Sequence, residues 1–222
     1  MCFRWLNITR NSRIILAIVF FVTVSGCVHH HPLNLTIAKE RVEKYHSCGQ
    51  YDKDLDNVVH CALKHFKNIS PCNNATVVFD IDDTILSGYC NEKSISFGYI
   101  PKLSHEWILR ADAPAIQQTK HLYDYLVGRG FHIIFLTGRK HDEYDATIKN
   151  LNAQGFTHFD KLIVREQYEQ NLTAKAYKSA RRKQLTKEGY RIVGDVGDQW
   201  SDLEGGYSGY KIKIPNYRYT IA

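Results

Sequence analysis

The sequence predicts an α/β fold in which a doubly wound parallel sheet lies between two layers of helices, three layers in all. From residue 76 onward, apolar strand-like runs alternate with segments of helical periodicity. Alternation of this kind implies right-handed crossover connections and hence a parallel sheet. A chain of 222 residues with 44% hydrophobic content can also bury one substantial core. With five prolines and no Gly/Ser-rich tract, the sequence indicates one domain over residues 35–222.

Two helices are expected before the sheet, over residues 35–47 and 51–69, separated by Cys48-Gly49-Gln50. The second carries an apolar stripe at helical spacing, made of Leu55, Val58, Val59, Ala62, Phe66 and Ile69. Such a stripe is typical of a helix packed on a core. The two segments are therefore interpreted as an N-terminal helical hairpin.

Five strands are expected after the hairpin. The run at 76–81 is continuously apolar, as expected of a strand buried on both faces. The other expected strands are 131–136, 161–164, 190–193 and 210–214, and the expected helices lie near 113–128, 140–154 and 174–188. Asp112 and Pro114 are start signals for the helix at 113–128, and Gly128 and Gly130 are stop signals. The aromatic stretch at about 86–112 should form a small cap over the carboxyl ends of the strands.

Two carboxylates follow the first strand, where Asp80-Ile81-Asp82 leads into a loop. In a doubly wound sheet, ligands bind beyond the carboxyl ends of the strands. A carboxylate at the position of Asp80 could attack phosphorus and form an aspartyl phosphate. Asp82 could protonate the leaving oxygen and later deprotonate water. A buried acid pair without a cation would be costly, so the pair also predicts a bound cation.

Two further strand ends carry polar groups. At Thr137-Gly138-Arg139, a hydroxyl and an exposed backbone N–H at a helix start would form a phosphate cradle. Beyond the strand at 190–193, Asp198 and Asp202 are spaced so that both can face one site. Mg²⁺ suits such a pair, because it needs few protein carboxylates and takes phosphate oxygens and waters as its other ligands.

Four motifs, taken in chain order, resemble the signature of the haloacid-dehalogenase-like (HAD) superfamily. They are DxDDT, then TG, then a lysine-bearing helix, then GDxxxD. The strings that carry the resemblance are Phe79-Asp80-Ile81-Asp82-Asp83-Thr84-Ile85-Leu86, Leu136-Thr137-Gly138-Arg139, Tyr177-Lys178-Ser179 with Arg182, and Gly197-Asp198-Gln199-Trp200-Ser201-Asp202-Leu203. More narrowly, they are similar to the class B/C acid phosphatases related to plant vegetative storage proteins and bacterial lipoprotein acid phosphatases. Gly49-Gln50-Tyr51-Asp52 and Ile214-Pro215-Asn216 also resemble that family, so the resemblance covers about residues 33–222.

The resemblance implies a HAD-like Rossmannoid domain and a role for each matched residue. Asp80 would be the nucleophile and a magnesium ligand, and Asp82 the acid/base, with its backbone carbonyl also on the metal. The transferring phosphoryl group would be bound by Thr137, Gly138 and Lys178. Asp198 would ligate magnesium, and Asp202 would be a ligand or would orient a metal-bound water. Lys175 competes for the lysine role, but the Tyr-Lys-Ser match selects Lys178.

Two positions depart from the family pattern. Asp195 stands where the family often has Asn, which adds negative charge near the site. The tail Asn216-Tyr217-Arg218-Tyr219 differs from the usual Pro-Asn-Pro-Met-Tyr-Tyr ending. We expect neither departure to touch the four motifs.

The function expected from these features is a magnesium-dependent acid phosphatase that hydrolyses small phosphorylated substrates. The alternatives are a non-enzymatic storage or binding protein of the same fold, because some plant relatives lack the nucleophilic Asp, and a phosphotransferase. A mutase would need a cap larger than the roughly 25 residues available.

A nucleic-acid partner is disfavoured, because Arg4, Arg10 and Arg13 supply half of the formal charge of +6. The basic cluster at Lys175, Lys178, Arg181, Arg182, Lys183 and Lys187 is interpreted as a solvated helix face with one functional member. The oligomeric state is left open.

The N-terminus indicates export. A basic segment ending at Arg13 precedes a short apolar stretch, which is typical of a signal peptide over residues 1–26. Val24-Ser25-Gly26-Cys27 resembles a bacterial lipobox, so Cys27 is predicted to be lipidated and to anchor the protein to a membrane through a tether at 27–34. That hypothesis places the protein in the periplasm or cell envelope. Ordinary cleavage at the same small residues would instead give a secreted protein.

Four more cysteines, Cys48, Cys61, Cys72 and Cys90, make an even number in an oxidising compartment and predict two disulfides. Cys72 and Cys90 lie at opposite ends of the strand at 76–81, roughly 20 Å apart at about 3.3 Å per residue. A disulfide needs Cα atoms within about 7 Å. Of the two schemes that remain, Cys61–Cys72 with Cys48–Cys90 is preferred.

Overall fold

The computed structural model describes residues 33–221. By its internal contacts the chain divides into two units, Met1–Leu33 and Asn34–Ala222, and the elements below belong to the second. The predicted signal peptide, Cys27 and all but the end of the tether lie outside the described residues. Within 33–221, none of the helices combines the length and apolar character needed to cross a membrane.

The predicted helical hairpin is present as α1 (Leu35–Ser47) and α2 (Gln50–Lys67). Asn34 caps α1, because its side chain accepts hydrogen bonds from the backbone N–H groups of Thr36 and Ile37. Gly49 turns the chain between the helices with a left-handed backbone (φ 76°), which glycine adopts without steric cost. The buried residues of α2 are Tyr51, Leu55, Val59, Ala62 and Phe66, so most of the predicted stripe faces the core.

The sheet has five parallel strands in the order β3-β2-β1-β4-β5. Their bounds are β1 (Ala75–Phe79), β2 (His132–Lys140), β3 (Lys161–Arg165), β4 (Arg191–Gly197) and β5 (Tyr210–Lys213). The chain runs outward from β1 through β2 to β3, and then returns to place β4 on the other side of β1. The carboxyl ends of the neighbouring strands β1 and β4 therefore form the switch point, where doubly wound sheets bind their ligands.

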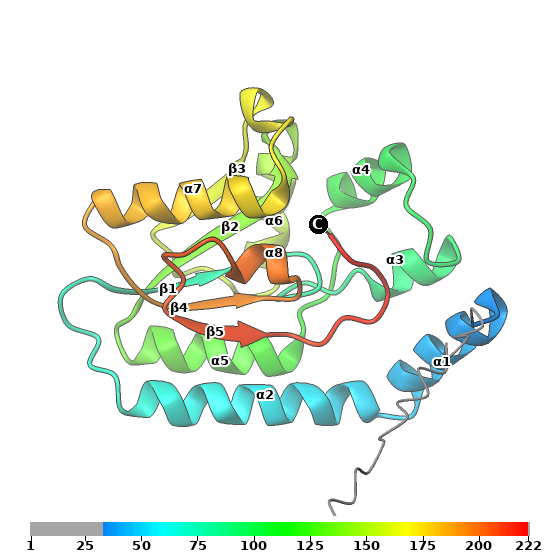
Figure 1. Ribbon diagram of the computed structural model, residues 1–222, viewed down its shortest axis with the longest axis horizontal. Helices are drawn as coiled ribbons and strands as arrows, with labels where there is room; N and C mark the ends of the chain where they lie inside the picture. The colour runs from blue at the N-terminus through cyan, green and yellow to red at the C-terminus, as the bar shows by residue number, and fades with distance from the viewer. Residues whose placement is uncertain (1–32, 222) are drawn as a thin grey trace, which may run out of the picture. The chain divides into compact units, whose positions relative to one another are not determined.

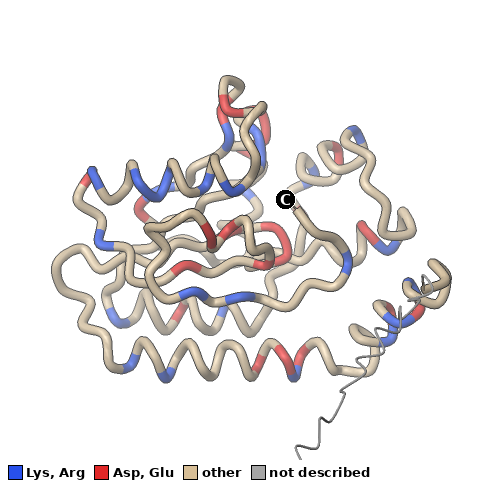
Figure 2. The backbone as a smooth tube through the Cα atoms, in the orientation of Figure 1, with Lys and Arg blue, Asp and Glu red and all other residues tan. Residues whose placement is uncertain are grey.

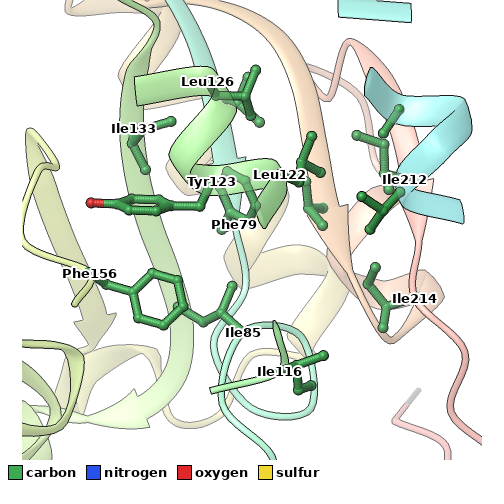
Figure 3. Packing of buried hydrophobic residues seen from close by; sticks show 14 of the residues in the cluster. Phe79, Ile85, Ile116, Leu122, Tyr123, Leu126, Ile133, Phe156, Ile212 and Ile214 are labelled. Atoms are coloured by element: carbon green, nitrogen blue, oxygen red, sulfur yellow. The ribbon is translucent and has the colours of Figure 1, made fainter. Parts of the chain in front are cut away.

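Helices cover both faces of the sheet, so the predicted three-layer fold is confirmed (Figure 1). On one face, Phe79 and Ile133 pack with Leu122, Tyr123 and Leu126 of α5 (Gln117–Gly128), as Figure 3 shows. On the other face, Val78, Ile134 and Leu136 pack with Tyr177 and Leu185 of α7 (Ala174–Lys187). Adjacent strand residues thus face opposite layers, as strand geometry requires.

Two further helices outside the cap are α6 (Tyr144–Ala153) and α8 (Trp200–Leu203), with 3₁₀ turns at His141–Glu143 and Gln167–Glu169. Basic positions follow the length of α7 (Figure 2). Three of them, Lys175, Lys183 and Lys187, are exposed, whereas Lys178 and Arg182 are buried. The interpretation of this cluster as a solvated face therefore fits the exposed members and not Arg182.

The predicted cap consists of two helices, α3 (Tyr89–Ser94) and α4 (Pro101–Arg110). The helix expected from residue 113 begins only at Gln117, because residues 114–116 pair with residues 85–87 as extended backbone. The Ser87 N–H donates to the Pro114 carbonyl (2.8 Å), and the Ile116 N–H donates to the Ile85 carbonyl (2.9 Å). This pairing uses the backbone groups that a longer helix would need.

Neither predicted disulfide is formed. Cys48, Cys61, Cys72 and Cys90 are all free and exposed. The buried stripe of α2 directs Cys61 toward solvent, whereas Cys72 follows the turn beyond the end of α2. Strand length could disfavour one pairing scheme, but it could not show that the remaining thiols meet.

Candidate active site

A cavity of about 520 Å³ lies at the carboxyl ends of the strands. The core contributes Asp80, Asp82, Lys178, Asp198 and Asp202 to its walls. The cap contributes a largely apolar wall, which includes Phe97, Tyr99, Ile100, Trp107 and Ile108. The cap also contacts the core beside this cavity, where His105 Nδ1 of α4 lies 2.8 Å from Glu143 Oε1. The residues predicted as the site and the predicted cap therefore share one pocket.

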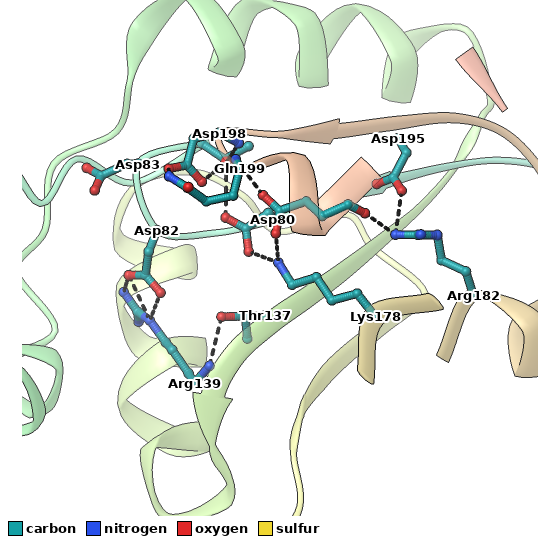
Figure 4. A network of polar contacts seen from close by, with 12 residues as sticks. Asp80, Asp82, Asp83, Thr137, Arg139, Lys178, Arg182, Asp195, Asp198 and Gln199 are labelled. Atoms are coloured by element: carbon teal, nitrogen blue, oxygen red, sulfur yellow. Dashed lines mark hydrogen bonds and ion pairs between the residues drawn. The ribbon is translucent and has the colours of Figure 1, made fainter. Parts of the chain in front are cut away.

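Asp80 is the first residue after β1, and its backbone N–H donates to the Val196 carbonyl of β4 (2.9 Å). The sheet register therefore fixes its position between the two strands of the switch point. Its buried carboxylate accepts a hydrogen bond from Thr84 Oγ1 (3.0 Å) through Oδ2 and forms an ion pair with Lys178 Nζ through Oδ1. Lys178 Nζ also lies 2.6 Å from Asp202 Oδ1, so one ammonium joins two carboxylates. Figure 4 shows its contact with Asp80.

Asp80, Asp198 and Asp202 form a buried cluster in which one carboxylate oxygen from each lies within 4.8 Å of the others. Asp198 and Asp202 follow β4, as the GDxxxD spacing predicts. Thr84 also joins the cluster, because the Asp198 N–H donates to its hydroxyl (3.0 Å). Asn216 Nδ2 and Gln199 Nε2 each lie 2.6 Å from Asp198 Oδ2. A set of oxygen donors held in this way could hold a hard cation.

The charges of this cluster do not balance. Burial raises the pKa of Asp80 well above its ordinary value, although Lys178 opposes the shift. Burial, with the nearby charges of Asp202 and Asp83, raises the pKa of Asp198 to about 7. For Lys178, burial lowers the pKa, but Asp202 and Asp80 outweigh it and the net shift is upward. One ammonium thus faces three buried carboxylates, and a divalent cation would fit the negative charge that remains.

The carboxylate of Asp82 is not part of this cluster. It is held by Arg139, whose Nη2 lies 2.7 Å from Asp82 Oδ1 and whose Nε lies 3.1 Å from Oδ2. Arg139 Nη1 also donates to Thr147 Oγ1 of α6 (3.1 Å). The Arg139 side chain is 1% exposed and that of Asp82 is 34% exposed. Asp82 therefore faces the pocket while a buried guanidinium fixes its orientation.

Thr137 and Gly138 lie near the cluster but not at a helix start. Strand β2 continues through both residues to Lys140, because Lys140 pairs with Arg165 of β3 after a register shift. The Thr137 hydroxyl is buried and accepts the Arg139 N–H (3.1 Å), whereas Gly138 lines the pocket. The prediction of a helix N-terminus here was wrong, and a phosphate cradle at this point would use the end of a strand.

Both departures from the family pattern contact the motifs, contrary to expectation. Arg182, which is fully buried, forms an ion pair with Asp195 (2.9 Å) and donates to the backbone carbonyl of Asp202. Arg218 Nη2 lies 2.6 Å from Asp83 Oδ1, and the Tyr219 hydroxyl donates to Asp83 Oδ2 (2.7 Å). The contacts of the tail with Asp83 join segments more than a hundred residues apart. No local pattern in the sequence predicts them, although the resemblance at Ile214-Pro215-Asn216 had indicated that the tail belongs to the same domain.

Comparisons with known proteins agree with this architecture. A family model described as HAD superfamily, subfamily IIIB (acid phosphatase), matches residues 29–222. The stem 28 kDa glycoprotein of Glycine max is 37% identical over 195 residues, covering 84% of this chain and 77% of that protein. Acid phosphatase 1 of Solanum lycopersicum is 34% identical over 186 residues (81% and 73% covered), and vegetative storage protein 2 of Arabidopsis thaliana is 34% identical over 197 residues (82% and 71%).

The fold also has a counterpart among solved structures. The class C acid phosphatase from Bacillus anthracis superposes with a TM-score of 0.67 at 21% identity, covering 84% of this chain and 85% of that one. At this identity the likeness shows the fold alone. The family follows from the sequence matches: this chain belongs to the acid phosphatase subfamily IIIB of the HAD superfamily.

Proposed function

We propose that this protein is a magnesium-dependent acid phosphatase that hydrolyses phosphomonoesters through an aspartyl phosphate on Asp80. The observation that carries the proposal is the buried contact of Asp80 with Lys178 inside a cluster of three carboxylates at the switch point of the sheet. A nucleophilic carboxylate must be ionised and must lie where a phosphoryl group can reach it. Asp80 lines the pocket and has a permanent ammonium beside it.

Mg²⁺ would be held by Asp80, Asp198 and Asp202, with the Asp82 backbone carbonyl as a further ligand. When bound, the ion would neutralise charge on the phosphoryl group and favour the ionised form of the surrounding carboxylates. The donor set supports Mg²⁺, because it consists of hard oxygens and the described residues place no cysteine among them.

The proposed reaction has two steps. In the first, an Asp80 oxygen bonds to phosphorus, the bond from phosphorus to the leaving oxygen breaks, and Asp82 gives its proton to that oxygen. In the second, Asp82 takes a proton from water, the water oxygen bonds to phosphorus, and the bond between Asp80 and phosphorus breaks. Lys178 and the strand end at Thr137-Gly138 would bind the phosphoryl oxygens. The second step thus leaves Asp80 ionised and Asp82 protonated, as they were before the first.

A second candidate is a non-enzymatic storage or binding protein, and the similarity to a vegetative storage protein favours it. The presence of Asp80 supports the enzyme instead. Phosphate release from p-nitrophenyl phosphate, glycerol phosphate and nucleotides would decide between them. We expect release with Mg²⁺ and none after EDTA treatment, whereas a storage protein would release none in either condition.

The proposed site of action is outside the cytosol. Relatives named stem glycoproteins support passage through a secretory pathway, because glycosylation occurs there. A lipid anchor at Cys27 is a more specific hypothesis than export, and it remains a prediction. Fractionation of wild type and Cys27→Ala would test it, since an anchored protein should leave the membrane fraction when the cysteine is lost.

A further inference from the structure

The tail after β5 places one buried arginine between two acidic side chains from separate segments. Arg218 Nη2 lies 2.6 Å from Asp83 Oδ1, just after the Asp80–Asp82 motif, and Nη1 lies 3.0 Å from Glu92 Oε2 of cap helix α3. The side chains of Arg218 and Asp83 are 1% and 2% exposed. Such a buried charge requires its partners, so the three groups form one unit.

Asp83 fixes the loop that carries the proposed catalytic acids. Its backbone is left-handed (φ 56°), which is costly for a residue with a side chain and persists only where the surroundings enforce it. The Asp83 N–H donates to the Leu86 carbonyl (2.7 Å), and Asp83 Oδ1 accepts the Gly88 N–H (2.8 Å). Arg218 and Tyr219 bind the same carboxylate from the tail. The tail therefore supports the turn immediately after Asp82.

Glu92 connects the same guanidinium to the cap. Helix α3 is also held from its other side by α1, where Lys93 pairs with Glu43 (2.9 Å) and the His46 ring stacks on Tyr89 (centroids 4.1 Å apart). The cap helix is thus fixed at its contact with α1 and at its contact with the tail. Only the tail contact also reaches the loop after β1.

We infer that Arg218 is a positioning residue that holds the loop at residues 80–88 and cap helix α3 in one arrangement through Asp83 and Glu92. It does not touch the reacting groups. Without the guanidinium, Asp83 on the loop and Glu92 on the cap would both lose the ion pair that joins them to the tail, so the contact between the loop and the cap would loosen. This inference rests on the proposed phosphatase function for its kinetic consequence only.

Amide hydrogen exchange tests the inference without any activity. Arg218→Met keeps the bulk of the side chain and removes its charge, and we expect the amides of residues 81–88 and 89–94 to exchange about tenfold faster or more. Arg129→Met is the matched control. Arg129 donates to the carbonyls of Phe66 and Ile69 (2.9 Å each) at the opposite ends of the strands. Its replacement should therefore leave the exchange rates of the amides at 81–94 unchanged. Wild-type exchange at 81–88 in Arg218→Met would overturn the inference.

A double variant covers the case in which Arg218→Met does not fold. Arg218→Met with Glu92→Gln removes the guanidinium together with one of the two acidic groups that face it, so one buried carboxylate instead of two is left without its cation. Its residues 81–88 should still exchange faster than those of wild type, because Asp83 lacks its guanidinium. Wild-type exchange in the double variant would equally overturn the inference.

Kinetics separate positioning from general stabilisation. In Arg218→Met we expect kcat to fall by about tenfold or more per folded molecule. The loss should be larger for glycerol phosphate than for p-nitrophenyl phosphate, because a poor leaving group depends most on a correctly placed Asp82. The double variant should recover at least part of the loss, and Arg129→Met should keep the wild-type ratio between substrates. An unchanged ratio in Arg218→Met would contradict positioning. If wild type releases no phosphate, the proposed function fails, while the exchange experiment still decides the role of Arg218.

Discussion

Arg139 holds Asp82 through two of its nitrogens, with Nη2 2.7 Å from Oδ1 and Nε 3.1 Å from Oδ2. Asp82 must carry a proton in the first proposed step and lose it in the second. A guanidinium that donates to both carboxylate oxygens fixes the direction in which the carboxylate points. Arg139 therefore sets the orientation of the proposed acid/base, which lines the pocket.

Arg139→Lys should expose this effect. Lysine keeps the charge but cannot donate in the same two-pronged geometry. We expect phosphate release from glycerol phosphate to fall by about 10- to 100-fold, and release from p-nitrophenyl phosphate to fall less, because its leaving group needs less protonation. Arg110→Lys, at an exposed arginine of the cap, is the control. Equal losses for the two substrates would mean that Arg139 acts on the fold and not on Asp82.

Replacement of Asp80 by asparagine should affect the reaction differently from replacement of Asp82. Asp80→Asn should abolish phosphate release, because an amide does not form the acyl phosphate. Asp82→Asn should slow both steps but still allow some phosphorylation of Asp80 by p-nitrophenyl phosphate. Rapid-quench labelling with a ³²P-labelled substrate measures this directly, and Asp124→Asn, an exposed partner of Lys120 on α5, is the control. Label on Asp82, or full turnover by Asp80→Asn, would contradict the proposed mechanism.

Stability without metal should fall as pH rises. The pKa of Asp198 is about 7 in the folded metal-free chain and near 3.8 when it is unperturbed, so the folded state binds this proton more tightly. Between these values the free energy of unfolding decreases with increasing pH, by a few kcal/mol at most. We expect a higher Tm at pH 5.5 than at pH 7.5 in EDTA, and a smaller difference in saturating Mg²⁺, which favours the ionised carboxylate.

Asp198→Asn tests the assignment of that pH effect. The variant should reduce the Tm difference between pH 5.5 and pH 7.5 in EDTA, and it should weaken the stabilisation by Mg²⁺. Some pH dependence should remain, because burial also raises the pKa of Asp195 to about 8. Differential scanning calorimetry in both buffers gives the comparison. A pH effect as large in Asp198→Asn as in wild type would show that other groups cause it.

Gly197 is predicted to be intolerant of any side chain. A Cβ at this position would lie 2.5 Å from the Asp202 Cβ, so alanine would displace the carboxylate that pairs with Lys178. We expect Gly197→Ala to raise the Mg²⁺ concentration needed for half-maximal activity by about tenfold or more. Gly128→Ala, where a Cβ meets nothing within 4 Å, is the control and should stabilise the protein by about 0.4–1 kcal/mol. Equal metal dependence in the two variants would contradict the prediction.

Local sequence patterns were enough to predict the layered architecture and the meeting of three carboxylates at one edge of the sheet. The apolar run ending at Phe79 and the alternation of strands and helices are local patterns, and burial on both faces of a parallel sheet requires them. Asp80, Asp198 and Asp202 follow strand ends, and strand ends of a parallel sheet meet at one edge. The positions of these carboxylates could therefore be predicted from order and spacing alone.

Tertiary structure alone decided how the charges are paired. Asp82 binds Arg139 from the next strand, Asp195 binds Arg182 of α7, and Asp83 binds Arg218 of the tail. It also decided that α5 begins at Gln117 and that Cys61 and Cys72 are exposed and unpaired. Each of these outcomes depends on which distant segment of the chain packs beside the residue. A buried charge takes whichever partner packing brings within about 3 Å, and sequence spacing does not encode that choice.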